Sequence, residues 1–275
     1  MSAMNLVKRG LFNRLFSLWV VFFIAGCTTT GVGPASQREG AKQAVSESTP
    51  KNEGQQRAKI HVELGALYLV DGRPAVAMEE ARIALSADPS YAPAYNLLGL
   101  VHMGLGEPKL AEENFRQALQ LAPGDPEISN NFGWFLCQSG REKQSLAYFD
   151  ASARNPLYSS PTKPNTNAGI CSIRLKNDKA AANFLLEALR LAPENTQAMY
   201  WLAEIDYRQG NYVEARRWLS GIEKVQALDA ELTWFVLRIE RKLGNREAEA
   251  RFANDLRKRF ANSPEQRLLS QGVYE

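Results

Sequence analysis

Histidine and cysteine are scarce in this sequence. The chain of 275 residues contains two histidines, His61 and His102, and three cysteines, Cys27, Cys137 and Cys171. No HExxH, CxxC, GxSxG or phosphate-binding glycine loop occurs, so the common signatures of metalloproteases, dithiol oxidoreductases, serine hydrolases and nucleotide-binding enzymes are missing. We therefore expect a protein that is not an enzyme, with no catalytic residue, metal, cofactor or small-molecule substrate.

An excess of positive charge is also missing once the first residues are set aside. The whole chain has 33 basic and 30 acidic residues. Residues 1–26 contain the basic residues Lys8, Arg9 and Arg14 and no acidic residue, so the rest of the chain is formally neutral. Nucleic-acid-binding domains are typically strongly basic, and the sequence therefore predicts no nucleic-acid partner.

The long apolar run of the chain lies at its N-terminus. Residues 15–25 (LFSLWVVFFIA) follow the basic residues and are fewer than the ~20 that span a membrane. The run ends in Ile-Ala-Gly-Cys27, which resembles the bacterial lipobox. We expect residues 1–26 to be a lipoprotein signal peptide and Cys27 to be acylated. An ordinary secretory signal or an uncleaved anchor is the alternative.

The residues around the expected acylation site suggest where the protein is anchored. Thr28 follows Cys27, and the absence of Asp there resembles the outer-membrane lipoproteins of enteric bacteria. Residues 28–57 contain no aromatic residue and two valines, a composition typical of disorder. We therefore expect residues 27–57 to be a lipidated linker at the periplasmic face of the outer membrane.

Two series of glycines recur every 34 residues. The first series is Gly72, Gly106, Gly140, Gly210 and Gly244. The second series is Gly65, Gly99, Gly133 and Gly169. Both are interrupted after the third repeat, which locates a two-residue insertion in residues 155–165 (NPLYSSPTKPN). A period of 34 residues is that of the tetratricopeptide repeat, a helical hairpin.

The period predicts an all-α tetratricopeptide-repeat superhelix in residues 58–262. We expect its repeats at 58–91, 92–125, 126–161, 162–195, 196–229 and 230–262, followed by a C-terminal tail at 263–275. The sixth repeat matches poorly, since Thr233 and Glu249 occupy signature positions, and we expect a capping pair there. Hairpins of this kind must stack to bury their apolar faces, and their first helices line a concave face.

The concave face is the candidate binding groove. Positions 2, 5, 9 and 12 of each first helix should face it, and they carry amide, apolar and aromatic side chains suited to capturing a peptide. The candidate groove residues are Asn96, Leu100, Met103, Asn130, Trp134, Thr166, Ile170, Tyr200 and Tyr207. The alternative is that some of these residues pack between repeats.

Cys137 and Cys171 fall on the first helices of repeats three and four, which are neighbours in a stack. Disulfides persist in exported proteins, so we expect the two residues to form one. The alternative is a pair of buried free thiols.

The runs around these cysteines carry a family resemblance. Asn130–Gly140 reads NNFGWFLCQSG, Asn167–Cys171 reads NAGIC, and the insertion begins NPLYSSP. With the lipobox and the repeats, they resemble the type IV pilus biogenesis lipoproteins PilF and PilW. The resemblance implies a pilotin, which binds the outer-membrane secretin, supports its localisation and multimerisation, and is needed for fimbriae and twitching motility. The alternative is another envelope scaffold, such as an adaptor for peptidoglycan hydrolases or an outer-membrane assembly factor.

Overall fold

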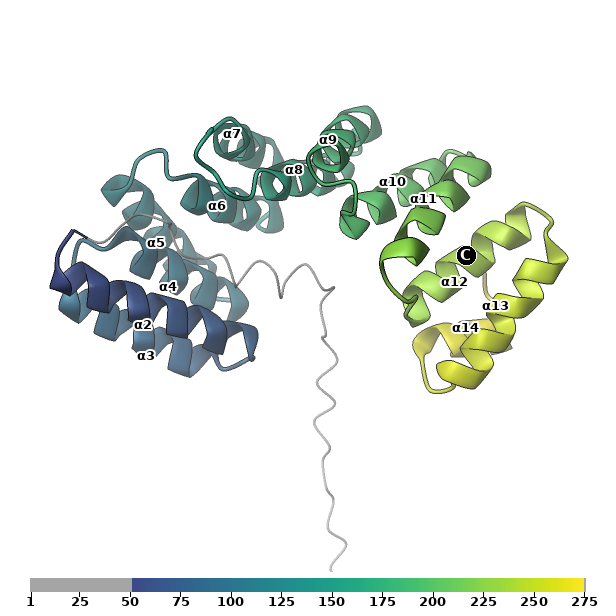
Figure 1. Cartoon of the computed structure of the whole chain (residues 1–275), viewed down its shortest axis with the longest axis horizontal. Coiled ribbons are helices and arrows are strands. Elements are labelled where there is room, and N and C mark those ends of the chain that lie inside the picture. The colour runs from purple at the N-terminus through teal and green to yellow at the C-terminus, as the bar shows by residue number, and fades with distance from the viewer. Residues whose placement is uncertain (1–50, 275) are drawn as a thin grey trace, which may run out of the picture. The chain divides into compact units, whose positions relative to one another are not determined.

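The computed structural model describes residues 51–274, and within them the regular secondary structure is entirely α-helical. Six helical hairpins follow one another along the chain and a single short helix comes last (Figure 1). This arrangement confirms the predicted tetratricopeptide-repeat superhelix.

The first helices of the hairpins are α2 (Glu53–Val70), α4 (Ala92–Gly104), α6 (Pro126–Gln138), α8 (Thr162–Arg174), α10 (Thr196–Arg208) and α12 (Ala230–Lys242). The second helices are α3 (Pro74–Ala87), α5 (Pro108–Leu121), α7 (Glu142–Ala153), α9 (Asp178–Leu191), α11 (Tyr212–Val225) and α13 (Arg246–Arg259). The last helix is α14 (Pro264–Gln271). From repeat two to repeat six, each first helix begins at the residue that the glycine spacing predicts.

The turn inside each hairpin uses a residue in the left-handed conformation. Glycine fills this position in five repeats, with φ between 72° and 82°, as in Gly72 and Gly210. Glycine suits such a turn because it has no Cβ to clash with the backbone. In repeat four the same position is occupied by Lys176, with φ 57°.

A second glycine lets the two helices of a hairpin approach closely. A Cβ added to Gly99 in α4 would lie 2.8 Å from the Phe115 ring in α5. A Cβ added to Gly133 in α6 would lie 2.9 Å from the Phe149 ring in α7. Both phenylalanines are buried, and their rings occupy the space that a Cβ on each glycine would otherwise fill.

The hairpins are held together by apolar contacts between neighbours. Each second helix from α3 to α11 packs on the first helix of the next repeat. One buried cluster joins Ala111 and Phe115 of repeat two to Phe132, Phe135 and Leu136 of repeat three. Since each repeat buries its apolar surface against the next, the stability of the array depends on these interfaces.

The N-terminal end of the array differs from the predicted boundary at residue 58. α2 begins at Glu53, and its N-cap is Asn52, whose Oδ1 accepts a hydrogen bond of 2.8 Å from the Gln55 amide. Residues 53–57 therefore belong to the first helix and not to the linker. Their polar composition suits an exposed first helical turn as well as it suits a linker.

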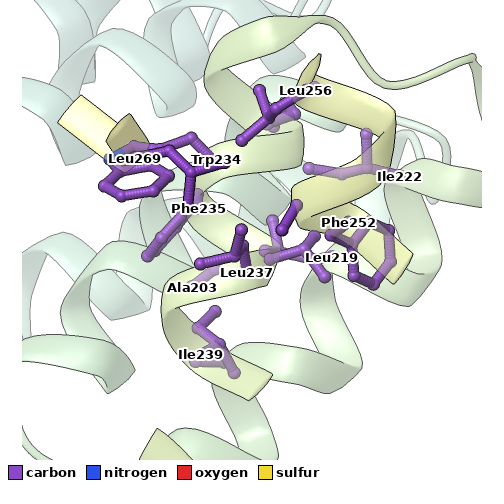
Figure 2. Packing of buried hydrophobic residues seen from close by; sticks show 14 of the residues in the cluster. Ala203, Leu219, Ile222, Trp234, Phe235, Leu237, Ile239, Phe252, Leu256 and Leu269 are labelled. Atoms are coloured by element: carbon purple, nitrogen blue, oxygen red, sulfur yellow. The ribbon is translucent and has the colours of Figure 1, made fainter. Parts of the chain in front are cut away.

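The C-terminal end of the array is more ordered than the sequence pattern predicted. α12 and α13 form a complete sixth hairpin, and α14 lies in the segment predicted as a tail. Side chains from α10 to α14 share one buried cluster, which includes Leu219, Phe235, Phe252 and Leu269 (Figure 2). The last helix thus covers the apolar surface that a seventh repeat would otherwise cover.

Candidate peptide-binding face

The first helices form a continuous layer, because α2, α4, α6, α8 and α10 contact one another in succession. We use the term first-helix face for the side chains at positions 5, 9 and 12 of the first helices, counted from the predicted start of each repeat. All nine predicted groove residues lie at these positions. The structure divides the nine into a buried group and a partly exposed group.

The buried group consists of Asn96, Asn130, Thr166 and Ile170. Their exposed fractions are 0%, 2%, 3% and 8%, respectively. The prediction that they line an open groove is wrong, because these side chains are buried within the array. The alternative reading, packing between repeats, describes them correctly.

A chain of amide hydrogen bonds connects the buried Asn96, Asn130 and Asn131 of repeats two and three to the partly buried Asn167 of repeat four. The Asn131 Nδ2 donates to Asn96 Oδ1 (3.3 Å), and the Asn130 Nδ2 donates to Asn131 Oδ1 (3.3 Å). The Asn167 Nδ2 then donates to Asn130 Oδ1 (3.0 Å). Since a buried amide is costly to leave unpaired, this chain fixes the register of α4, α6 and α8 instead of offering groups to a peptide.

The partly exposed group consists of Leu100, Met103, Trp134, Tyr200 and Tyr207. Leu100 and Met103 pack against the Phe115 cluster between repeats two and three. Trp134 packs against the cluster that contains Cys137 and Phe149. These side chains combine a packed side with an exposed side, as the anchor residues of binding surfaces do.

The face continues from repeat five into repeat six. The Tyr200 hydroxyl donates a 2.8 Å hydrogen bond to Glu231 Oε1, and burial, together with that carboxylate, raises the pKa of Tyr200. The rings of Tyr200 and Tyr207 meet the Phe235 ring edge-on, with centroids 5.8 and 5.5 Å apart. The guanidinium of Arg238 lies 4.8 Å from the centre of the Tyr207 ring.

The prediction from sequence missed the part of this face in repeat six. Trp234, Arg238 and Arg241 stand at positions 5, 9 and 12 of α12, the register used for the earlier repeats. The sequence signal for them is weak, because the sixth repeat matches its signature poorly. The signal that locates them is the 34-residue register, extended from Tyr200, Glu204 and Tyr207.

The junction between repeats three and four is held by a buried carboxylate. Glu127 is 4% exposed, and it accepts hydrogen bonds from the Tyr158 hydroxyl (2.6 Å) and the Lys163 ammonium (3.0 Å). Burial raises the pKa of Glu127, and the charge of Lys163 opposes that rise. Two residues of the insertion are therefore bound to Glu127, while Leu157, next to Tyr158, is 87% exposed.

Cys137 and Cys171 lie at the same junction, on α6 and α8. Their Cα atoms are 6.0 Å apart, and their Sγ atoms are joined in a disulfide. Both residues are fully buried. The formation of this bond in the protein produced by cells stays a prediction, tested below.

Cys27, the predicted acylation site, and the signal peptide lie outside the described residues. Within residues 51–274, no helix combines the length and the apolar character needed to cross a bilayer. The same residues contain no group of histidine, cysteine and carboxylate side chains that could bind a metal. The two histidines each pair with a carboxylate instead, His61 with Glu80 (2.7 Å) and His102 with Glu107 (2.6 Å).

Two segments of the chain match known families of helical repeats. Tetratricopeptide-repeat family models match residues 92–125 and 176–233. Together with the six hairpins and the first-helix face, these matches identify a tetratricopeptide-repeat protein.

More specific relatives define the family. The chain is 30% identical to PilW, whose crystal structure is described as that of a widely conserved type IV pilus biogenesis factor; the match covers 78% of this chain and 98% of PilW, with a TM-score of 0.72. It is 26% identical over 251 residues to the type IV pilus assembly protein PilF of Pseudomonas aeruginosa, covering 90% of this chain and 94% of PilF. The solved structure of that PilF has the same fold, with a TM-score of 0.71 at 24% identity. The chain belongs to the PilF/PilW family.

Proposed function

We propose that this protein is an outer-membrane lipoprotein pilotin. In this role it binds the type IV pilus secretin and supports secretin localisation and multimerisation, and hence pilus biogenesis and twitching motility. The observation that carries the proposal is the likeness to PilW, a type IV pilus biogenesis factor, over 98% of that chain. An array of stacked hairpins is a scaffold for binding other proteins, and the proposed role requires no catalysis.

The partly exposed residues of the first-helix face are the proposed contact surface. Leu100, Met103 and Trp134 offer apolar area in repeats two and three, and Tyr200 and Tyr207 offer aromatic rings in repeat five. Large apolar and aromatic side chains supply most of the binding free energy at protein interfaces. An extended or helical segment of the secretin is the proposed ligand.

Binding of purified protein to the periplasmic part of the secretin tests this surface. Trp134→Ala should weaken binding at least ten-fold, the loss of a hot-spot contact worth about 1.4 kcal/mol or more. The matched control is Trp218→Ala, another half-buried tryptophan, which lies on the second helix α11 and outside the first-helix face. Far-UV circular dichroism checks that both variants stay helical. Equal binding by Trp134→Ala and the parent protein would move the interface to another face.

The lipid anchor is the second part of the proposal. A single acyl chain binds a membrane marginally and several chains anchor a protein stably, so an acylated Cys27 would hold the array at the outer membrane. Cys27→Ala should release the protein from the membrane fraction and mislocalise the secretin. If Cys27→Ala stays in the outer-membrane fraction, Cys27 does not provide the anchor.

The competing role is that of an envelope scaffold for a different complex. Affinity purification from cross-linked cells separates the two roles, because a pilotin should recover the secretin. Recovery of a peptidoglycan hydrolase or an outer-membrane assembly factor without the secretin would favour the scaffold.

A further inference from the structure

The chain returns to its own first-helix face after α14. Gly272 ends α14 in the left-handed conformation, with φ 70°. The Val273 amide donates a 3.0 Å hydrogen bond to the Leu268 carbonyl oxygen, which reverses the chain direction. Val273 and Tyr274 are not helical, and they run back to α12.

Tyr274 meets α12 at the three positions that define the first-helix face. Its ring stacks on the Trp234 ring, with centroids 5.5 Å apart and planes at 21°. The Arg241 guanidinium lies 3.9 Å from the centre of the Tyr274 ring. The Arg238 Nε donates a 2.8 Å hydrogen bond to the Tyr274 carbonyl oxygen. These residues are at positions 5, 12 and 9 of α12, respectively.

The contacts are those by which a groove binds a peptide from another chain. An aromatic side chain is held by stacking and by a cation, and the ligand's main chain is recognised through its carbonyl group. The Arg238 side chain is held in position to donate this hydrogen bond, because its guanidinium also stacks on the Tyr207 ring of repeat five. With Tyr274 in place, Trp234 is only 7% exposed, although the other large residues of the face in repeats two, three and five stay partly exposed.

We propose that Trp234, Arg238 and Arg241 form a binding site for an extended peptide segment that bears an aromatic side chain, and that Tyr274 occupies this site in cis. Arg241 also pairs with Glu249 (2.7 Å), so the Arg238 Nε, which binds the Tyr274 carbonyl oxygen, is the donor available to the main chain of the partner segment. A partner segment of this kind replaces Tyr274. This proposal holds whether the partner is the secretin or another envelope protein.

The tether makes Tyr274 a strong competitor. Only Gly272 and Val273 separate it from α14, and a ligand held by so short a link has an effective concentration on the order of millimolar. A free peptide with the same contacts therefore binds the parent protein poorly. Removing the Tyr274 ring removes the competition and leaves the receptor residues of α12 intact.

The test uses the full mature chain and the synthetic peptide acetyl-SQGVYE, which copies the end of this sequence. Titration is followed through the Trp234 indole N–H signal in ¹H–¹⁵N spectra, assigned with Trp234→Phe. Tyr274→Ala should bind the peptide saturably and at least ten-fold more tightly than the parent chain. Arg238→Ala added to Tyr274→Ala should weaken that binding at least ten-fold. The peptide acetyl-SQGVAE, which lacks the ring, should not bind.

An unmoved Trp234 signal in Tyr274→Ala, or equal binding by the parent chain and Tyr274→Ala, would overturn the proposal. A second variant covers the possibility that Tyr274→Ala loosens α14. Arg238→Gln keeps the ring, and it should release the tail, seen as a fall in the heteronuclear NOE of the Val273 and Tyr274 amides. Unchanged order in this variant would mean that Arg238 does not hold the segment.

Discussion

At the scale of single residues, Lys176 departs from the rule that the other turns follow. It is the sole non-glycine residue with positive φ in residues 51–274. The left-handed conformation costs a side chain ~1–2 kcal/mol, and glycine regains only part of this because it loses more entropy on folding. We predict that Lys176→Gly raises the free energy of unfolding by about 0.5–1 kcal/mol in urea titrations. The reverse change, Gly140→Lys, should lower it by about 1 kcal/mol. A loss of stability in Lys176→Gly would contradict this reading of the turn.

Gly99 tests the close approach of paired helices. A Cβ there would lie 2.8 Å from the Phe115 ring, which is fully buried. Gly99→Ala should therefore destabilise the protein by about 1–3 kcal/mol, the usual cost of overpacking a core. Gly104→Ala is the control in the same helix, because nothing lies within 4 Å of the added Cβ. The control should be neutral or slightly stabilising, since alanine is the better helix former. Equal thermal denaturation midpoints for the two variants would rule out the steric explanation.

At the scale of elements, the disulfide connects the first helices of repeats three and four. Cys137 and Cys171 enclose 34 residues, for which the chain-entropy model gives a stabilisation of roughly 4 kcal/mol. Replacing both residues by serine should lower the free energy of unfolding by up to that amount. Mass spectrometry after alkylation, with and without reductant, checks the bond itself. Two alkylated thiols in unreduced periplasmic protein would show that the bond does not form.

The insertion depends on the buried hydrogen bond between Tyr158 and Glu127. Tyr158→Phe keeps the ring and removes the donor, which leaves a buried carboxylate short of a partner. We expect a loss of about 1–3 kcal/mol, as for other hydrogen bonds to charged groups. Tyr95→Phe removes a 3.3 Å hydrogen bond to the Pro89 carbonyl at an exposed site, so it should change stability by less than about 0.5 kcal/mol. Similar unfolding midpoints for both variants would mean that the junction does not rely on this bond.

The hairpins could be predicted from the sequence because each repeat contacts only its neighbours. The spacing of the glycine series therefore predicts the turns, and it predicts where the first helices from Ala92 to Ala230 begin. Exposure along the first-helix face could not be predicted in this way. Ile170 and Trp134 share position 9, yet only Trp134 is partly exposed. Periodicity gives the side of a helix on which a residue lies, whereas the approach of the next repeat decides whether that residue is covered. The contact of Tyr274 with α12 has no periodic signal at all.

At the scale of the whole molecule, the first-helix face changes character along the array. Repeats two and three offer Leu100, Met103 and Trp134, an apolar and aromatic surface beside a buried amide chain. Repeats five and six offer tyrosine and arginine side chains, beside the Trp234 ring that Tyr274 covers. Two regions of different chemistry on one face suit a partner that is engaged at two points. Such engagement would raise avidity without requiring either contact to be strong.

The proposed role of this protein is to support assembly of the type IV pilus secretin. The most direct measurement is an immunoblot of the secretin in unheated outer-membrane fractions from cells that lack this protein. We expect secretin multimers to be lost or mislocalised in these cells and the parent chain to restore them, whereas Trp134→Ala should restore them poorly. Normal multimers at the outer membrane in the deleted strain would contradict the claim.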